Sequence, residues 1–195
     1  MELSHTTLCI LIGVGLSCAI GFKIILPVFV LSLLSYFGEI ELNESYSWLS
    51  SKYTLVALGI AFCYETLSTL IPGLAGMQKF MAVFIAPLVA FWVSVAILPS
   101  ETSEFIKWSS ALICGTTSFG VAATTSGIRA STAFVTGGAN APVSGGVEIG
   151  ASLLSSILAM ICPILIPIFI IIVCIILFFV IRKILSIRKL KKSNV

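Results

Sequence analysis

The sequence is dominated by apolar runs about as long as a membrane-spanning helix, and two of these runs carry a charged residue near the middle. Lys23 lies within the apolar run Thr7–Phe37, and Glu65 lies within the run Tyr53–Pro72. A helix needs about 20 apolar residues to cross the hydrocarbon core of a bilayer. A charged side chain at that depth is costly unless it is paired, hydrated or neutralised. The chain therefore has to fold so that these two side chains face protein or water.

The composition indicates a polytopic membrane protein. Of the 195 residues, 58% are hydrophobic and 10% are charged, and the mean hydropathy is +1.17. Soluble domains contain about 45–50% apolar residues. The first apolar run follows Glu2 with no basic stretch before it and is longer than the apolar part of a signal peptide, so we expect no cleavable leader.

Apolar runs and the breakers between them predict an all-α protein with six spanning segments. The six are Thr7–Phe37, Tyr53–Pro72, Phe80–Leu98, Phe105–Ile128, Val143–Cys162 and Ile164–Leu185. The first is overlong and is interrupted by Gly21, Lys23 and Pro27. The alternative joins the last two segments into one helix, which would be about 65 Å long against a hydrocarbon core of about 30 Å. Length therefore favours six segments over five.

The charged residues outside the apolar runs predict an orientation in the membrane. Six of the eleven basic residues fall in the last fourteen positions. Basic segments stay on the cytoplasmic side of the inner membrane, so we interpret this tail as an anchor rather than as a binding element for lipid or a partner. With six spans the N-terminus is cytoplasmic as well. The glutamate-bearing loops Gly38–Lys52 and Pro99–Glu104 then lie outside, and the loop Gly73–Lys79 lies inside.

A weak internal repeat divides the chain into two halves. Residues 21–23 (Gly-Phe-Lys) resemble residues 127–129 (Gly-Ile-Arg), and Glu65 corresponds to Glu148. Three spans per half would give the halves inverted topology, as in small transporters whose broken helices surround the site. Chance similarity between apolar helices is the alternative. The predicted parts are a first three-helix half (1–99), a second (100–186) and a basic cytoplasmic tail (187–195).

The stretch Ser126–Ser152 is unlike a lipid-facing helix, because it is rich in Gly, Ala, Ser and Thr. Irregular backbone at membrane depth survives only inside protein or beside water, which predicts a broken or re-entrant segment before helix five. Asn140 and Pro142 suit a helix start, and a helix N-terminus near Arg129 would favour an anion. Close packing of helices is the alternative explanation for the small residues.

These features define a candidate substrate or ion site. Its residues are Lys23, Glu65, Arg129, Asn140, Ser144 and Glu148. In this hypothesis the cations and the helix start hold an anion, and a glutamate takes up a proton and couples it to alternating access. The structural alternative is that Lys23 with Glu65, and Arg129 with Glu148, are ion pairs that tie helices together.

We therefore predict a small transporter or channel for an anionic solute or a lipid head group, with membrane lipids as its surroundings. A structural or accessory membrane protein without transport activity is the alternative. A lipid-modifying enzyme has less support, because there is one histidine, the six cysteines stand singly in apolar runs, and no activated nucleophile is evident. We expect no metal, no cofactor and no nucleic-acid partner, since the matching motifs are missing.

The chain resembles the uncharacterised bacterial membrane proteins of the family named domain of unknown function 4126, from about Gly13 to Ile181. The residues that carry the resemblance are Gly21-Phe22-Lys23 with Pro27, Glu65 ahead of Pro72-Gly73, Arg129, Asn140, Pro142, Ser144 and Glu148. The resemblance implies an integral membrane protein and brings no established activity.

The chain also departs from the pattern of that family. The resemblance implies Arg at the position of Lys23 and an Asp-Lys pair where this chain has Thr69-Leu70. It implies an acidic pair where Glu148 stands alone, and the chain contains no Asp at all. If relatives use those carboxylates to bind a proton or a cation, we expect that coupling to be absent or simplified in this chain.

Overall fold

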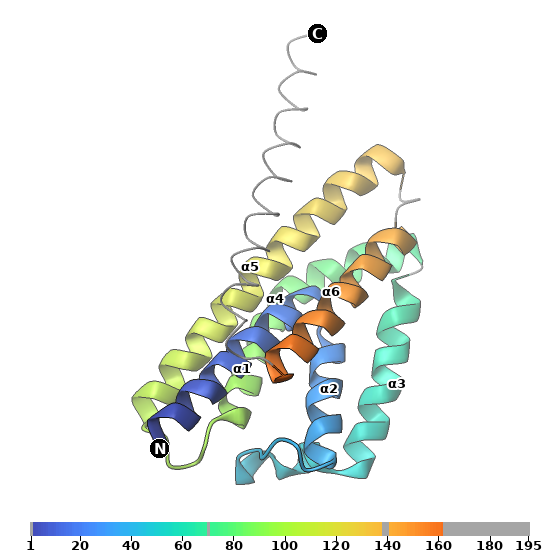
Figure 1. The fold of residues 1–195 in the computed structure, drawn as a ribbon. Coiled ribbons are helices and arrows are strands. Elements are labelled where there is room, and N and C mark those ends of the chain that lie inside the picture. The colour runs from blue at the N-terminus through green and yellow to red at the C-terminus, as the bar shows by residue number, and fades with distance from the viewer. Residues whose placement is uncertain (1, 70, 138–140, 162–195) are drawn as a thin grey trace.

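The computed structural model describes residues 2–69, 71–137 and 141–161, and every regular element in them is helical (Figure 1). The elements are α1 (Glu2–Phe22), α2 (Ile25–Tyr36), the short 3-10 helix η1 (Glu44–Ser50), α3 (Lys52–Ser68), α4 (Pro72–Ile97), α5 (Glu104–Thr136) and α6 (Ala141–Ile161). The predicted all-α class is confirmed for this part of the chain. Four of these helices, α1, α4, α5 and α6, are long and apolar enough to cross a membrane. The predicted segment Ile164–Leu185 and the basic tail lie outside the described residues.

The predicted first spanning segment is two helices rather than one. α1 ends at Phe22 and α2 begins at Ile25. Pro27 explains the break, because proline lacks an N–H and its ring would clash with the carbonyl of Lys23, four positions earlier in a continuous helix. In the first turn of a new helix that missing N–H costs nothing. The expected interruption is therefore confirmed, and the single span is wrong.

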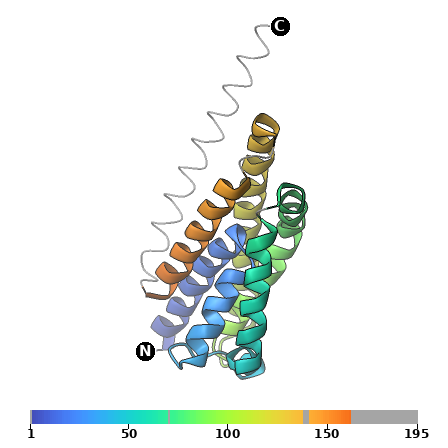
Figure 2. The ribbon, with the colours of Figure 1, turned by 90° about the vertical axis from the view of Figure 1, so that its right-hand side faces the viewer.

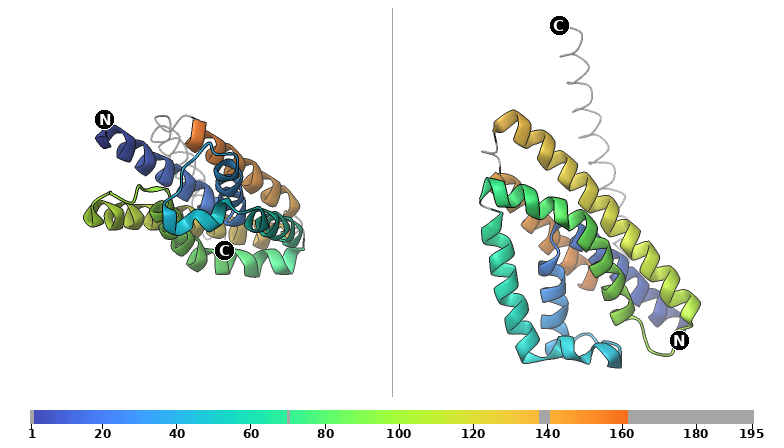
Figure 3. Two further views of the ribbon diagram at one scale, coloured as in Figure 1. Left: turned by 90° about the horizontal axis from the view of Figure 1, so that it is seen from below. Right: turned by 180° about the vertical axis from the view of Figure 1, so that it is seen from behind.

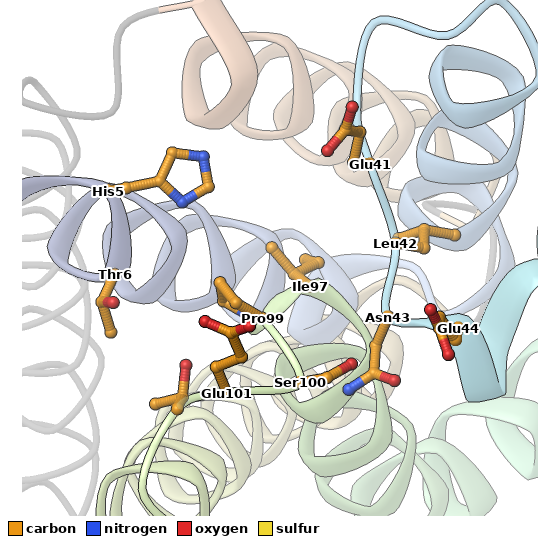
Figure 4. A pocket seen from close by; sticks show the side chains of 11 residues that line it. His5, Thr6, Glu41, Leu42, Asn43, Glu44, Ile97, Pro99, Ser100 and Glu101 are labelled. Atoms are coloured by element: carbon orange, nitrogen blue, oxygen red, sulfur yellow. The ribbon is translucent and has the colours of Figure 1, made fainter. Parts of the chain in front are cut away.

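α2 turns back against the direction of α1, so the two helices form a hairpin. His5 near the start of α1 lines the same pocket as Glu41 and Glu44, which follow α2 (Figure 4). Figures 1 and 2 show the start of α1 and the end of α2 at one end of the molecule. With 12 residues, α2 is about 18 Å long and too short to cross a core of about 30 Å.

This end of the molecule, which we call the acidic end, gathers both glutamate-bearing loops. Glu101, from the loop between α4 and α5, lines the same pocket of about 500 Å³ as Glu41 and Glu44. Asn43 ties the first loop to the end of α4, because its backbone N–H donates to the carbonyl of Ala96 at 2.9 Å and its side-chain amide donates to the carbonyl of Leu98 at 3.4 Å. The two acidic loops therefore share a face, as the sequence predicts. The start of α1 lies there too, so the prediction that the N-terminus and the loop Gly38–Lys52 occupy opposite faces is wrong.

α1 is the central helix, and α4, α5 and α6 pack around it. Leu16 and Ile20 of α1 are fully buried in a core to which α4, α5 and α6 contribute four alanines, Ala86, Ala90, Ala122 and Ala159. Small residues let helix backbones approach closely. The closest approach is at Gly21, where a Cβ atom would lie 2.5 Å from Cβ of Val121 and 2.9 Å from the carbonyl oxygen of Ser118.

The directions of the helices contradict part of the predicted inverted repeat. Gly13 faces Cys114 and Gly21 faces Val121, so α1 and α5 run parallel. Inverted halves would require these two corresponding helices to run in opposite directions, so the prediction is wrong for this pair. α3 and α6 do run in opposite directions, and α5 lies antiparallel beside α4 (Figure 3). The division into halves at residues 99 and 100 falls in the loop between α4 and α5 and stays a prediction.

The glycine-rich stretch is mostly helical. α5 continues without interruption for 33 residues, about 50 Å, to Thr136, and Gly137 ends it in the left-handed conformation with φ of +60°. α6 begins at Ala141 and includes Gly145 and Gly146. The described residues of this stretch are helical up to Thr136 and again from Ala141, Asn140 lies outside them, and the broken or re-entrant segment stays a prediction.

We predict that Gly21→Ala lowers the stability of the protein, because the added methyl group meets α5 backbone and cannot be absorbed by rotating a side chain. Overpacking of this kind costs about 1–3 kcal/mol. Gly127→Ala is the matched control, since nothing lies within 4 Å of a Cβ built there. Thermal unfolding in detergent measures both variants, and equal melting temperatures for the two would contradict the close contact at Gly21.

We also predict that both arms of the hairpin open to one face of the membrane. Single cysteines replacing His5 and Glu41, which are both exposed, should react with a membrane-impermeant maleimide from the same side. A cysteine replacing Thr136 at the opposite end of α5 should react from the other side. The background protein has its own cysteines replaced by alanine. Labelling of positions 5 and 41 from opposite sides would show that the first apolar run crosses the membrane.

Candidate functional site

Five buried charged side chains meet at the hairpin tip, which comprises residues 22–25. Each is at most 7% exposed. This charged cluster consists of Lys23 from the tip, Glu65 from α3, Lys79 from α4, Arg129 from α5 and Glu148 from α6. Three cations face two carboxylates, so the formal charge of the cluster is one positive unit in excess. Each of the four helices around the tip contributes one charge.

Glu65 caps the N-terminal end of α2. Its two carboxylate oxygens accept the backbone N–H groups of Ile24 and Ile25 at 3.1 and 3.2 Å. The residue at the cap position, Ile24, has no polar side chain to do this itself. The first N–H groups of a helix lack partners within the helix and carry partial positive charge. A carboxylate from a neighbouring helix therefore satisfies them both by hydrogen bonding and by charge.

Lys79 caps the other side of the break. Its ammonium donates to the carbonyl oxygen of Phe22 at 2.7 Å. In a continuous helix that carbonyl would accept the N–H of Leu26. A cation at a helix C-terminus interacts favourably with the partial negative charge there. The two interrupted helix ends thus each meet a side chain of opposite charge, Lys79 for α1 and Glu65 for α2.

The same lysine links the break to α6. Lys79 Nζ lies 3.0 Å from Oε2 of Glu148, and Arg129 Nε lies 3.8 Å from Oε1 of the same carboxylate. Arg129 also donates to the hydroxyl of Ser144 from Nε at 3.2 Å and from Nη2 at 3.1 Å. Glu148 therefore sits between two cations, which offsets the cost of burying it.

Small and hydroxyl-bearing residues of α6 make this arrangement possible. A Cβ on Gly145 would lie 3.4 Å from both Arg129 Nη2 and the side chain of Thr69, so a methyl group there would already be in van der Waals contact and a larger side chain would not fit. About two turns further along α6, the hydroxyl of Ser152 donates to the carbonyl of Ala19 at 3.0 Å. The small residues of this stretch thus serve close packing, the alternative that the sequence leaves open, and they also bring Arg129 against α6.

Lys23 differs from the other members of the cluster. It is 2% exposed, and among the residues that the structure describes its ammonium makes no ion pair or hydrogen bond. It lines a cavity of about 280 Å³ together with Glu65, Gln78 and Lys79. Since a water molecule occupies about 30 Å³ of liquid, the cavity has room for several waters or a small solute.

A second cavity of about 280 Å³ lies on the α5–α6 side of the hairpin tip. Its polar lining includes Arg129, Ser144 and Glu148. Phe22 lines both cavities. The charged cluster is therefore flanked by open space on two sides, with the last residue of α1 between them. Neither space holds three or more metal-ligating side chains among the described residues.

The structure brings five of the six predicted site residues together, while Asn140 lies outside the described part. The Arg129–Glu148 pair is present. Lys23 and Glu65 approach each other without forming an ion pair, because the Glu65 carboxylate turns to the backbone of α2. These expectations did not include Lys79, which sequence reasoning placed in a loop before a span starting at Phe80. Pro72 is the overlooked signal, since proline favours the first turn of a helix and α4 begins there.

We predict that Lys79→Met destabilises the protein by about 3–5 kcal/mol, because it removes one partner of a buried ion pair and leaves the Phe22 carbonyl without its donor. Lys107→Met is the matched control. Lys107 pairs with Glu104 at 3.2 Å, but the Glu104 side chain is 73% exposed. Removing such a surface pair should cost about 0–1 kcal/mol. Thermal unfolding of both variants in detergent checks the difference, and comparable losses would mean that the cluster does not support the break.

The chain can be placed in a family by its sequence. No curated protein matches it, and no solved structure does either. The sequence model of the family described as Domain of unknown function (DUF4126) matches residues 10–183, which covers all of the charged cluster. The chain is therefore a member of the DUF4126 family of unknown function, and its apolar helices are those of an integral membrane protein.

Proposed function

We propose that the protein is a small transporter or channel for an anion. The observation that carries this proposal is the charged cluster at the hairpin tip, which has one more cation than carboxylates and lies between two cavities. Charged residues within membrane segments are expensive to bury and tend to mark ion or substrate pathways. Broken helices at such a site are typical of secondary transporters, whose helix ends hold ions.

The position of Phe22 suggests how an anion would pass. The residue lines both cavities, and its carbonyl is held by Lys79. A shift of the hairpin tip would connect the space beside Lys23 with the space beside Arg129. The anion would then always have a cation close by, Lys23 and Lys79 on one side and Arg129 on the other.

We place the protein in the inner membrane with the acidic end outside. The positive-inside rule concerns basic residues, and those of the sequence are concentrated in the tail. Since the start of α1 shares the acidic end, the N-terminus would lie outside, contrary to the orientation that six spans imply. The predicted segment Ile164–Leu185, outside the described residues, would bring the tail to the cytoplasmic side.

A structural or accessory role is the second candidate, and a specific observation favours it. Glu65, Lys79 and Glu148 all have partners that stabilise the fold. If the cluster only ties helices together, replacing Lys23 and Glu65 together by Met and Gln should leave the cellular function intact. Glu65→Gln alone should be more harmful than the pair, because it leaves the buried Lys23 ammonium without a nearby carboxylate.

Anion flux into proteoliposomes tests the first proposal. We expect purified protein to accelerate the entry of chloride or nitrate over empty liposomes, and Arg129→Gln to slow it at least tenfold, because it removes the cation of the second cavity. Glu104→Gln, a change at an exposed glutamate in the first turn of α5, should have no effect. Absence of flux for every anion tried, including glycerol phosphate as a lipid head group, would favour the accessory role.

A further inference from the structure

We propose that Glu65 is a tethered substitute for the transported anion, and that it leaves the site when it takes up a proton. This inference rests on the proposed function, since it names the substrate class and the coupling of the same site. In the present structure the carboxylate occupies the place where two backbone N–H groups converge, at the start of α2. That is the position in which a helix N-terminus binds a free anion.

The first support is the geometry of the cap. Each oxygen of Glu65 takes one N–H, from Ile24 and from Ile25, at 3.1 and 3.2 Å. Helix α2 has 12 residues, enough for the partial charge at its end to be developed. A free anion in place of the carboxylate would find the same two donors.

The second support is Lys23, which is independent of the cap. Lys23 is only 2% exposed. It lines the cavity beside Glu65 and makes no ion pair among the described residues. A buried ammonium is stable only with a compensating charge or with water. An anion bound at the start of α2 would give it that charge. The cavity of about 280 Å³ has room for a small anion.

The charges around Glu65 favour the uptake of one proton by its carboxylate for each anion that binds. Lys23 at the hairpin tip, Lys79 of α4 and Tyr64 of α3 line the same cavity as the Glu65 carboxylate. Arg129 of α5 and Glu148 of α6 belong to the charged cluster but do not line this cavity. The carboxylate and the two lysine cations therefore line one cavity. An entering anion neutralises those cations and repels the carboxylate, so proton uptake at Glu65 becomes easier.

Glu148 is less suited to this role. It is held by Lys79 at 3.0 Å and by Arg129 at 3.8 Å, whereas the carboxylate oxygens of Glu65 are bound only by backbone N–H groups. Protonation of Glu65 weakens those two bonds, because a neutral acid is a poorer acceptor than a carboxylate. The side chain can then swing toward the cavity while the anion takes the N–H groups. Anion and proton are bound together, and the total charge of the site is unchanged.

Chloride binding measured against pH tests this inference. Isothermal titration of the purified wild-type protein in detergent should show affinity for chloride that rises about tenfold for each unit that the pH falls, since one proton is taken up per anion. Nitrate should behave in the same way. Glu65→Gln, which is neutral at every pH, should bind chloride with an affinity that does not depend on pH and that equals the best wild-type value.

Two variants serve as controls. Lys23→Met should lower the chloride affinity at least tenfold while the thermal unfolding of the protein shows that it is folded. Glu104→Gln should keep the pH dependence of the wild type. The wild-type pH dependence stands by itself if Glu65→Gln fails to fold.

The failures of the two proposals can be told apart. Chloride binding or flux that does not depend on pH in the wild type would overturn the role of Glu65 and leave anion transport standing. Binding that Glu65→Gln abolishes in a folded protein would also overturn it, because the carboxylate would then be a ligand rather than a competitor. Binding of glycerol phosphate alone, without chloride or nitrate, would overturn the small-anion class. No binding and no flux of any anion would overturn both proposals.

Discussion

The rest of the structure depends on the hydrogen bonds that two charged side chains make with the backbone groups at the end of α1 and the start of α2. A break inside a bilayer exposes backbone groups that lipid cannot satisfy. Here the carboxylate of Glu65 takes the N–H groups of α2, and the ammonium of Lys79 takes the last carbonyl of α1. The positions of α3 and α4 relative to the hairpin follow from these contacts. Glu148 and Arg129 then attach α6 and α5 to the same point.

This arrangement also explains why buried charge is tolerated in so apolar a chain. Four members of the cluster compensate either another charge or a helix end, whereas Lys23 lines a cavity without an ion pair among the described residues. The cluster can therefore both tie the helices together and form an ion site. The capped ends hold the break in place, and the remaining positive charge gives the cavity a preference for anions.

Much of this could be predicted from the sequence. Isolated charges in apolar runs identified Lys23 and Glu65, and Pro27 indicated an interruption, because both effects are local. The direction taken after the break could not be predicted, since Pro27 ends a helix but leaves the turn open. The predicted inverted repeat was wrong for α1 and α5, because the similarity between residues 21–23 and 127–129 contains no information about the direction of the two helices. Lys79 was missed because a charge near the edge of an apolar run is typical of a loop as well as of a helix.

The hairpin has a consequence for the order in which the protein assembles in the membrane. The polar backbone of the hairpin tip finds its partners on Glu65 and Lys79, which are synthesised about 40 and 55 residues after it. When the first apolar run leaves the ribosome, neither partner has yet entered the membrane. The contacts that cap the hairpin tip can therefore form only after α3 and α4 have been inserted beside it. The earliest segment of the chain is thus completed by segments made later.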